Sequence, residues 1–391
     1  MTITRYAAIQ PRDPLIARDG RPFGADSGHR MRSHDWPLPS VAAGALRTLL
    51  GRKLGGNFSL GLIAELKSLV CRGPLPTHGG RLFVPAPDDV LRGRDKTPLS
   101  LRPVCASSGG GTDLPCGLSP VLAATRLGKA GSGPAWWSLE KAVEWLLIEN
   151  DVPPNFFDDA TQFRDAPERD ERIHLKIDPQ TLASKEGMLF STIGLALDDP
   201  HGEAALAMSA SHAANSSLND AWTGLPSFQP FGGERRLAEF AEDAKQESLW
   251  KIPAALKEQL SSRKAGSKLR MALASPAIFS NGWSPGWLNN TTPRIGSPPS
   301  LRKGELTLKL VAVANQRWQA VSGWSYESPT GPKAIRRMVP AGGVYFFEVE
   351  TCSDVDWDDL WLASVSDDIQ DRNDGFGLAL WGLWDERKGA F

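Results

Sequence analysis

Cysteine is scarce in this chain of 391 residues, and its spacing offers no metal site. Cys71, Cys105, Cys116 and Cys352 form no CxxC pair and no Cys/His ligand set, which favours reduced thiols. No apolar run reaches the roughly 20 residues needed to span a bilayer. The N-terminus lacks a basic stretch followed by an apolar one, so secretion is not indicated. We therefore expect a cytoplasmic protein with no metal site and no membrane contact.

Net charge is also almost absent, at −1, which argues against a free-standing, non-specific nucleic-acid binder. The charges are unevenly placed. Residues 1–60 hold nine Lys/Arg against four Asp, whereas residues 354–374 hold eight Asp against one Arg. This asymmetry suits a chain that faces an anion on one side and a partner protein on another. A solvated acidic surface explains the C-terminal cluster equally well.

The N-terminal stretch combines an apolar strand at Ile3–Ile9, a loop rich in Arg and Gly, and a helix at Ser40–Leu54. Ser40 is a predicted N-cap, and Gly55 ends the helix. Guanidinium groups beside a helix N-terminus favour a polyanion, because the N–H groups and the helix dipole add to their charge. No nucleophile with a paired base is evident, so we expect binding and no catalysis. The candidate binding residues here are Arg18, Arg21, His29, Arg30, Arg32 and Arg47.

Three shorter motifs carry further candidates. In "FGGERR", the turn at Gly232 and Gly233 stands beside Arg235 and Arg236, which suits a phosphate site or an ordinary surface turn. Arg336 and Arg337 precede an apolar β run and form a second group of candidate binding residues. "GFG", with Gly375 and Gly377, leads into an apolar strand, whereas a dinucleotide site needs a helix there. We therefore expect no nucleotide cofactor, and no cofactor of another kind.

Periodicity predicts the remaining elements. Residues 72–134 have weak periodicity and many Gly and Pro, which indicates long loops. A helix is expected at 136–149 and a β-hairpin at 172–197, where apolar and polar residues alternate. Further expected elements are a helix at 59–70, a helix at 249–260, strands at 269–279, 306–314, 316–323 and 344–349, and a short acidic helix at 355–362.

Tryptophan is unusually frequent, with fourteen residues against three Tyr. Several lie in segments rich in Gly, Ser or Pro: "AWWS", "NGWSPGW" and "SGWS". Indoles partly buried under loops are the ordinary explanation, and stacking platforms for bases are the alternative.

Several motifs occur together in an order that resembles one family. "DPLIARDGRPFG" followed by "LPSVAAGALRTLL" resembles the opening of the RAMP-superfamily subunit that binds the crRNA 5′ handle in the Cmr-type (type III-B) CRISPR–Cas effector complex. "RIHLKID" with "EGMLF", then "GGERR", "VPAGGVYFF" and "GFGLALWGLW" continue the likeness in the same order. Residues 72–150 take no part in it.

The resemblance implies an α+β fold with two tandem ferredoxin-like (RRM-type, RAMP) domains and a β-rich insertion. The expected boundaries are 1–71 for the first part of the N-terminal core, 72–235 for the insertion, and 236–391 for the C-terminal domain. In that family a Gly-rich loop, here 375–377, lies near RNA. The implied partners are the crRNA 5′ handle, the large polymerase-like subunit and the backbone RAMP subunit. The implied role is non-catalytic assembly of an antiviral ribonucleoprotein.

Two other functions stay open. A metal-independent RAMP endoribonuclease that processes precursor crRNA would need a general base and a general acid at the scissile phosphate. His29 or His34 with Tyr6 could take these roles, and His174 could act as a base in the hairpin, although no partner acid is evident. A purely structural adaptor would not touch RNA at residues 20–32.

Overall fold

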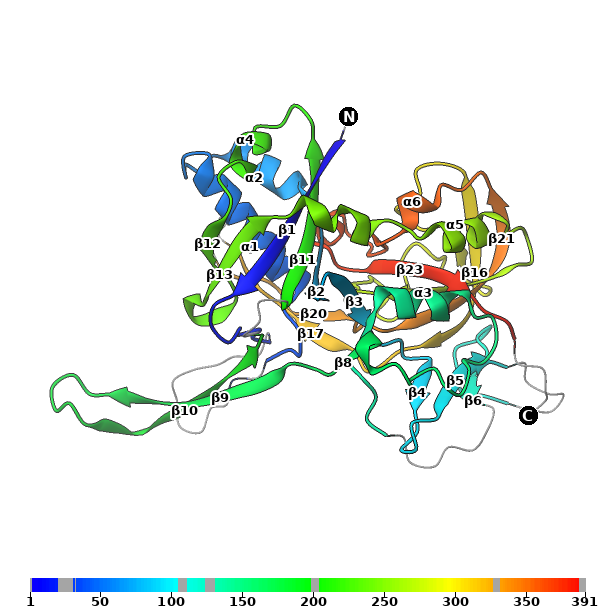
Figure 1. Ribbon diagram of the computed structural model, residues 1–391, viewed down its shortest axis with the longest axis horizontal. Coiled ribbons are helices and arrows are strands. Elements are labelled where there is room, and N and C mark those ends of the chain that lie inside the picture. The colour runs from blue at the N-terminus through cyan, green and yellow to red at the C-terminus, as the bar shows by residue number, and fades with distance from the viewer. Residues whose placement is uncertain are drawn as a thin grey trace. The chain divides into compact units, whose positions relative to one another are not determined.

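The computed structural model describes residues 2–19, 31, 33–104, 111–123, 131–197, 204–325 and 331–386, without the side chains of residues 186, 187 and 325. The chain forms two compact units (Figure 1). Unit 1 consists of Met1–Gly80, Ala166–Ala244 and Ala320–Arg337, and unit 2 consists of Arg81–Asp165, Lys245–Gln319 and Met338–Phe391. The fold is mixed α/β, made mostly of sheet with few helices.

Unit 1 is built on an antiparallel sheet in the order β12-β13-β1-β11-β2. β1 pairs with both β11 and β13, and β11 pairs with β2, so β1 and β2 run in the same direction. The predicted strand at Ile3–Ile9 is confirmed within β1. The strand bounds are β1 Thr2–Pro11, β2 Val70–His78, β11 Ala204–Ala213, β12 Ser227–Pro230 and β13 Leu237–Glu242.

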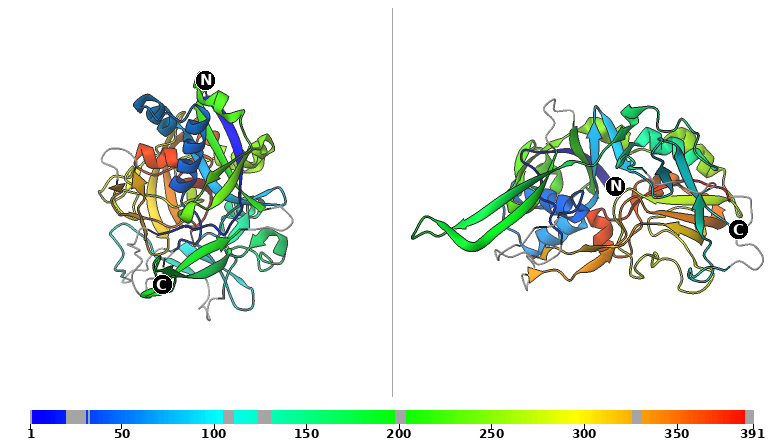
Figure 2. Two further views of the ribbon diagram at one scale, coloured as in Figure 1. Left: turned by 90° about the vertical axis from the view of Figure 1, so that its left-hand side faces the viewer. Right: turned by 90° about the horizontal axis from the view of Figure 1, so that it is seen from below.

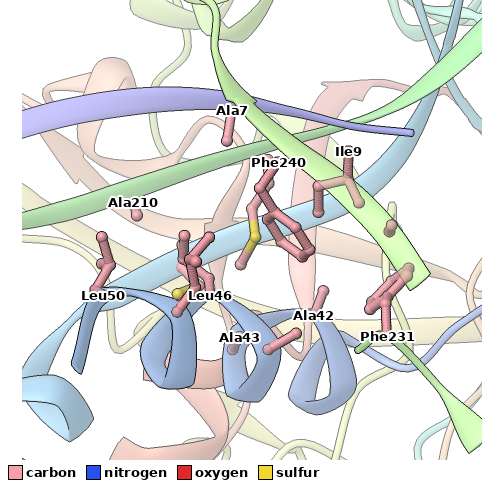
Figure 3. Close-up of a cluster of buried hydrophobic side chains, with 14 of the residues drawn as sticks. Ala7, Ile9, Ala42, Ala43, Leu46, Leu50, Ala210, Phe231 and Phe240 are labelled. Atoms are coloured by element: carbon pink, nitrogen blue, oxygen red, sulfur yellow. The ribbon is translucent and has the colours of Figure 1, made fainter. Parts of the chain in front are cut away.

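Helix α1 (Pro39–Lys53) covers one face of this sheet because its apolar side chains recur at helical spacing. Leu46 and Leu50 are fully buried in one apolar cluster with Ile9 and Phe240 of the sheet (Figure 3). Each such burial stabilises the fold by about 1.5–3 kcal/mol. The prediction of Ser40 as N-cap is wrong, because the helix already begins at Pro39, whose fixed φ suits the first helical position.

The second predicted helix is confirmed as α2 (Leu60–Ser68), where the hydroxyl of Ser59 caps the helix by accepting from the Leu62 amide. Glu65 of α2 accepts hydrogen bonds from Ser216 and Ser217, which lead into α4 (Leu218–Trp222). The Ser216 hydroxyl is the main cause that lowers the pKa of Glu65. α2 and α4 are therefore held together on unit 1.

The predicted β-hairpin is confirmed as β9 (Glu168–Ile177) and β10 (Ser184–Ala196). It projects as a two-stranded ribbon from unit 1 (Figures 1 and 2). His174 of β9 stacks on Phe190 of β10, with ring centroids 5.2 Å apart, and lies 2.8 Å from the Thr192 hydroxyl. These contacts give His174 a place in the packing of the hairpin, and a catalytic role for it stays untested.

Unit 2 is built on a second antiparallel sheet in the order β15-β16-β21-β14-β23-β22. Helix α3 (Leu139–Leu147) packs on β23, where a Cβ on Gly382 would lie 2.6 Å from the Leu146 carbonyl oxygen. Glycine at 382 therefore allows the close approach of helix and strand. The strand bounds are β14 Lys268–Leu273, β15 Ile295–Gly296, β16 Glu305–Ala314, β21 Val344–Ser353, β22 Ala363–Ser364 and β23 Leu378–Leu383.

Shorter elements complete the described residues. The expected helix at 136–149 begins only at Leu139, because Trp136–Ser138 forms β7 and the Ser138 hydroxyl caps the helix. The expected helix at 249–260 is α5 (Ala254–Ser261), which begins after Pro253. The others are β3 Arg81–Pro85, β4 Val90–Arg92, β5 Pro98–Pro103, β6 Val121–Ala123, β8 Phe163–Arg164, β17 Gln319–Val321, β18 Trp324–Ser325, β19 Gly331–Pro332, β20 Arg336–Met338, α6 Trp357–Leu360, α7 Ile369–Asp374, and the 3-10 helices Ala160–Gln162, Gly233–Arg235 and Ala244–Trp250.

The observed units differ from the expected division at 71 and 235. Residues 72–134 are not an insertion of loops, since they contain β2 to β6. Residues 81–165 belong to unit 2, where the Asp88 amide donates to the Gly342 carbonyl. None of the helices in the described part of the chain is long and apolar enough to cross a membrane.

Candidate nucleic-acid interface

The N-terminal segment that leads into the cationic loop is fixed by three parts of unit 1. Leu15 exchanges backbone hydrogen bonds with Leu195 at the base of the hairpin. The Gly233 amide donates to the Ile16 carbonyl at 2.9 Å, and Arg18 pairs with Ser33 in an antiparallel bridge. The structure therefore brings residues 15–18, 33, 195 and 233 together, although they are far apart in the sequence.

The cationic loop itself is only partly described. Arg18 is exposed at the edge of the described segment. Arg21, His29, Arg30 and Arg32 lie outside the described residues, so their roles stay predictions.

The turn at Gly232–Arg236 packs on this segment through its two glycines. A Cβ on Gly232, whose φ is +79°, would lie 2.6 Å from the Ile16 carbonyl oxygen. Glycine is needed here for both the backbone angle and the close approach. The exposed Arg235 has a φ of +54°. Its side chain is exposed and makes no ion pair with any described residue.

Other guanidinium groups nearby are shared with carboxylates. Arg236 lies 4.0 Å from Asp13, at the outer limit of an ion pair. Arg172 of β9 pairs with Asp170 and thereby lowers the pKa of that carboxyl group. Arg169 pairs with Asp35. These pairs are half-exposed or exposed, so solvent screens them and each can open toward a stronger anion. Sequence reasoning missed Arg169 and Arg172, which the "ERDERIH" strand places at the base of the hairpin.

Two sets of sequence candidates have internal structural roles. Arg47 is half-buried on α1 and donates to the Leu69 carbonyl, which ties the helix to the segment before β2. Gly375 is the left-handed cap of α7, and a Cβ on Gly377 would lie 2.6 Å from the Ser366 hydroxyl oxygen. The loop 375–377 is buried, and its carbonyls accept from Ser275 and Val365. These contacts explain the glycines without RNA, and RNA contact at these positions remains a prediction.

Arg336 and Arg337 are exposed on β20, which pairs with β17 in a separate two-stranded ribbon of the chain. Both residues take part in interactions within the chain. Their segment, Ala320–Arg337, belongs to unit 1, the unit that also holds Arg18 and Arg235.

The comparisons with known proteins identify the family. The family model described as CRISPR-associated protein (Cas_Cmr3) matches residues 7–384, which is nearly the whole chain. The chain belongs to the Cas_Cmr3 family. This membership confirms the expected place in the type III-B Cmr group of CRISPR–Cas proteins. A comparison with curated proteins gives no match.

Chains in solved structures of type III complexes also match this chain. A chain of the type III-B Cmr-beta complex bound to cognate target RNA has 17% identity and a TM-score of 0.47, over 88% of this chain and 86% of that one. A second Cmr-beta structure, bound to cognate target RNA and AMPPnP, has 14% identity and a TM-score of 0.46, over 88% and 86%. A chain of the type III-A Csm3–Csm4 subcomplex has 10% identity and a TM-score of 0.36, over 90% and 95%.

Unit 2 of this Cas_Cmr3-family chain contains a separate pocket of about 730 Å³, lined mostly by apolar residues with Trp283, Asn315 and Asp88. Asp88 accepts a hydrogen bond from the Gln316 amide, and burial raises its pKa to about 6. The described residues contain no group of three or more His, Cys, Asp or Glu that could hold a metal ion. The negative lining disfavours phosphate, so the pocket is not part of the candidate interface.

Asp88→Asn is expected to change how stability depends on pH. The pKa of an aspartate is near 3.9 in an unfolded chain, and that of Asp88 is about 6 in the folded protein. As pH rises from about 4 to 6 the unfolded state releases this proton first, so the wild-type protein loses stability across that window. The variant escapes this loss and should gain on the order of 2 kcal/mol relative to wild type between pH 4 and 7.

Thermal unfolding at the two pH values measures this gain. Asp95→Asn is the control, because Asp95 is exposed and its pKa is lowered by the Thr97 hydroxyl. Removing Asp95, whose pKa is lowered, should not give this gain, and the raised pKa of Asp88 is contradicted if Asp88→Asn follows the wild-type pH profile.

Proposed function

We propose that this chain is a non-catalytic crRNA-binding subunit of a type III-B effector ribonucleoprotein, and that it binds the repeat-derived 5′ handle. Family membership supports a role in that complex. The proposed partners are the crRNA, the large polymerase-like subunit and the backbone RAMP subunit, in the cytoplasm.

The observation that carries this proposal is the joining of two cationic segments in unit 1. The Gly233 amide donates to the Ile16 carbonyl, which places the turn bearing Arg235 and Arg236 directly on the segment that leads to Arg18. Exposed guanidinium groups beside backbone amides are suited to phosphates of a single strand. The handle is single-stranded, so its unstacked bases could be held against these loops and read at their edges.

Strand order supports the proposal that both units are ferredoxin-like. In unit 1 the strands β1, β2, β11 and β13 are the first to fourth strands in chain order. Across the sheet they lie in the order fourth, first, third, second (β13-β1-β11-β2), and helices follow the first and third strands in the chain. In unit 2 the strands β14, β16, β21 and β23 lie in the same order. This order, with helices in those two connections, is that of the ferredoxin-like fold. Unit 2 departs from it in one respect, because residues 274–304, all described, contain no helix.

Charge reversal at the interface tests the proposal. Arg18→Glu and Arg235→Glu should each weaken binding of a labelled 5′-handle RNA by roughly ten-fold or more, because each removes a charged hydrogen bond and adds repulsion. Fluorescence anisotropy at several salt concentrations measures both the affinity and its salt slope. Lys251→Glu is the matched control, since Lys251 is exposed in unit 2 and makes the same change of charge.

The same RNA decides between the alternatives. Incubation of precursor RNA with the protein, without metal, should leave it intact; cleavage that is lost in His34→Ala or His29→Ala would support the endoribonuclease instead. If the wild-type protein binds no handle RNA at all, the adaptor function is favoured.

A further inference from the structure

The exposed tryptophans of this chain are confined to one short segment. Of the fourteen tryptophans, only Trp318 and Trp324 are exposed, with exposed fractions of 46% and 56%. The other twelve are buried or half-buried, including those of "AWWS" and "NGWSPGW". Burying an indole is strongly favourable, so a surface that leaves two of them in water indicates a binding site.

This segment is an irregular ribbon of two described stretches, residues 319–325 and 331–338, which together we call the 319–338 ribbon. β17 pairs with β20, and Trp324 in β18 lies directly opposite Pro332 in β19. Between these pairs the Lys333 amide donates to Gly323 and the Ser322 hydroxyl donates to the Lys333 carbonyl. The backbone just before Trp324 is therefore held by two hydrogen bonds to Lys333 of the facing segment.

The ribbon also concentrates positive charge. Its described residues, with the two positions before them, contain no Asp or Glu, and Glu327 in the undescribed part is the one acidic residue of the sequence there. Ile335 beside them is 64% exposed. The cations are Arg317, Lys333, Arg336 and Arg337, all exposed.

We propose that the 319–338 ribbon is a base-stacking contact for single-stranded RNA, with Trp324 as the platform and the four cations along the backbone of the strand. This combination of aromatic faces and a cationic track is how proteins hold single strands without reading sequence. A protein partner fits less well, because four cations with no carboxylate among the described residues are unusual in the core of a protein interface. The inference rests on the proposed RNA-binding function and adds a second contact, separate in sequence from the N-terminal loop.

Trp324→Ala should weaken binding of a labelled oligoadenylate by about 5- to 150-fold, the effect of losing one base stack. Trp324→Phe should retain most of the affinity, since it keeps an aromatic face. Phe228→Ala is the matched control, because Phe228 is also 56% exposed in unit 1, and it should bind as wild type does. Thermal melting of each variant verifies that the exposed substitutions leave the fold intact.

Salt dependence separates stacking from charge. Trp324→Ala should lower the affinity without altering the slope of log K against log salt, whereas Lys333→Ala should reduce that slope by about 0.7. Crosslinking of thiouridine-labelled RNA should modify the tryptic peptide 318–333, which contains both exposed tryptophans.

The outcomes distinguish this inference from the proposed function. If Arg235→Glu weakens handle binding but Trp324→Ala binds handle RNA and oligoadenylate as wild type does, the ribbon inference is overturned and the proposed function stands. If the wild-type protein binds neither RNA, both are overturned. A Trp324→Ala variant that loses only its association with other subunits of the complex would make the ribbon a protein contact and overturn the inference.

Discussion

Replacing Arg270 by alanine is expected to destabilise unit 2 by about 3–5 kcal/mol, the cost of leaving a buried charge without its partner. Arg270 on β14 donates to the Asp89 carboxylate at 3.0 Å, and the exposed fractions of the two side chains are 5% and 3%. It also donates to the Trp145 carbonyl at 2.8 Å, and its guanidinium lies 4.3 Å from the Trp145 ring centroid. One side chain therefore joins the central strand to α3 and to the loop that carries Asp89.

Urea unfolding followed by tryptophan fluorescence measures this loss. Arg263→Ala is the control, because its pair with Glu149 at 2.9 Å is partly exposed and should be worth at most about 1 kcal/mol. The loss in Arg270→Ala should shrink at acid pH. Burial already raises the pKa of Asp89 to about 6 against the Arg270 charge, so without Arg270 the carboxyl group is protonated over a wider range.

The double variant Asp89→Leu/Arg270→Met separates charge from packing. If the unpaired charge causes the loss, removing both charges should restore most of the stability, as apolar replacements of buried pairs often do. A double variant as unstable as Arg270→Ala would instead show that packing around Trp145 carries the effect.

Local periodicity was sufficient to predict the elements whose own residues decide their structure. The β9–β10 hairpin alternates apolar and polar side chains, and α1 has apolar residues at helical spacing, so both follow from short-range rules. β2 was missed because its sequence, "VCRGPLPTH", contains Gly73, Pro74 and Pro76 and shows no alternation. That strand exists through its pairing with β11, more than one hundred positions away, which no local pattern records.

The candidate site shows the same limit in its side chains. Arg18, Arg47 and Arg235 are alike as residue types, yet Arg47 is half-buried and bonded to a carbonyl whereas the other two are exposed. The glycines of "GFG" fit an RNA loop and a buried helix cap equally well, and only the contacts of Gly377 with Ser366 distinguish the two. The sequence identifies candidate binding residues of this kind, and their burial in the structure shows which of them face solvent and which have a structural role.

Gly232→Ala is expected to impair RNA binding without touching any charge. A Cβ at this position would lie 2.6 Å from the Ile16 carbonyl oxygen and 2.8 Å from a Leu15 methyl group. The backbone, at φ +79° and ψ −160°, also lies in a region almost restricted to glycine, which costs about 1–3 kcal/mol for another residue. The turn can relieve the close contacts of the added Cβ and the backbone strain only by moving away from the N-terminal segment. This movement separates Arg235 from Arg18.

The matched control is Gly80→Ala. Gly80 has a similar φ of +75° in unit 1, but a Cβ there would meet nothing within 4 Å. Both variants should lose some stability from the backbone angle, and only Gly232→Ala should also bind 5′-handle RNA at least roughly ten-fold more weakly, since it alone disturbs two charged contacts. Anisotropy titrations beside thermal melts give both quantities for each protein.

The comparison decides whether the two cationic segments act as one site. If Gly232→Ala weakens handle binding as much as Arg235→Glu does, and combining the two adds little, the docking of the turn on Ile16 is what makes Arg235 effective, because mutations that act through one contact are not additive. If Gly232→Ala loses stability but binds RNA as well as Gly80→Ala does, the turn and the N-terminal segment contact RNA independently or not at all. In that case the interface cannot rest on their juxtaposition.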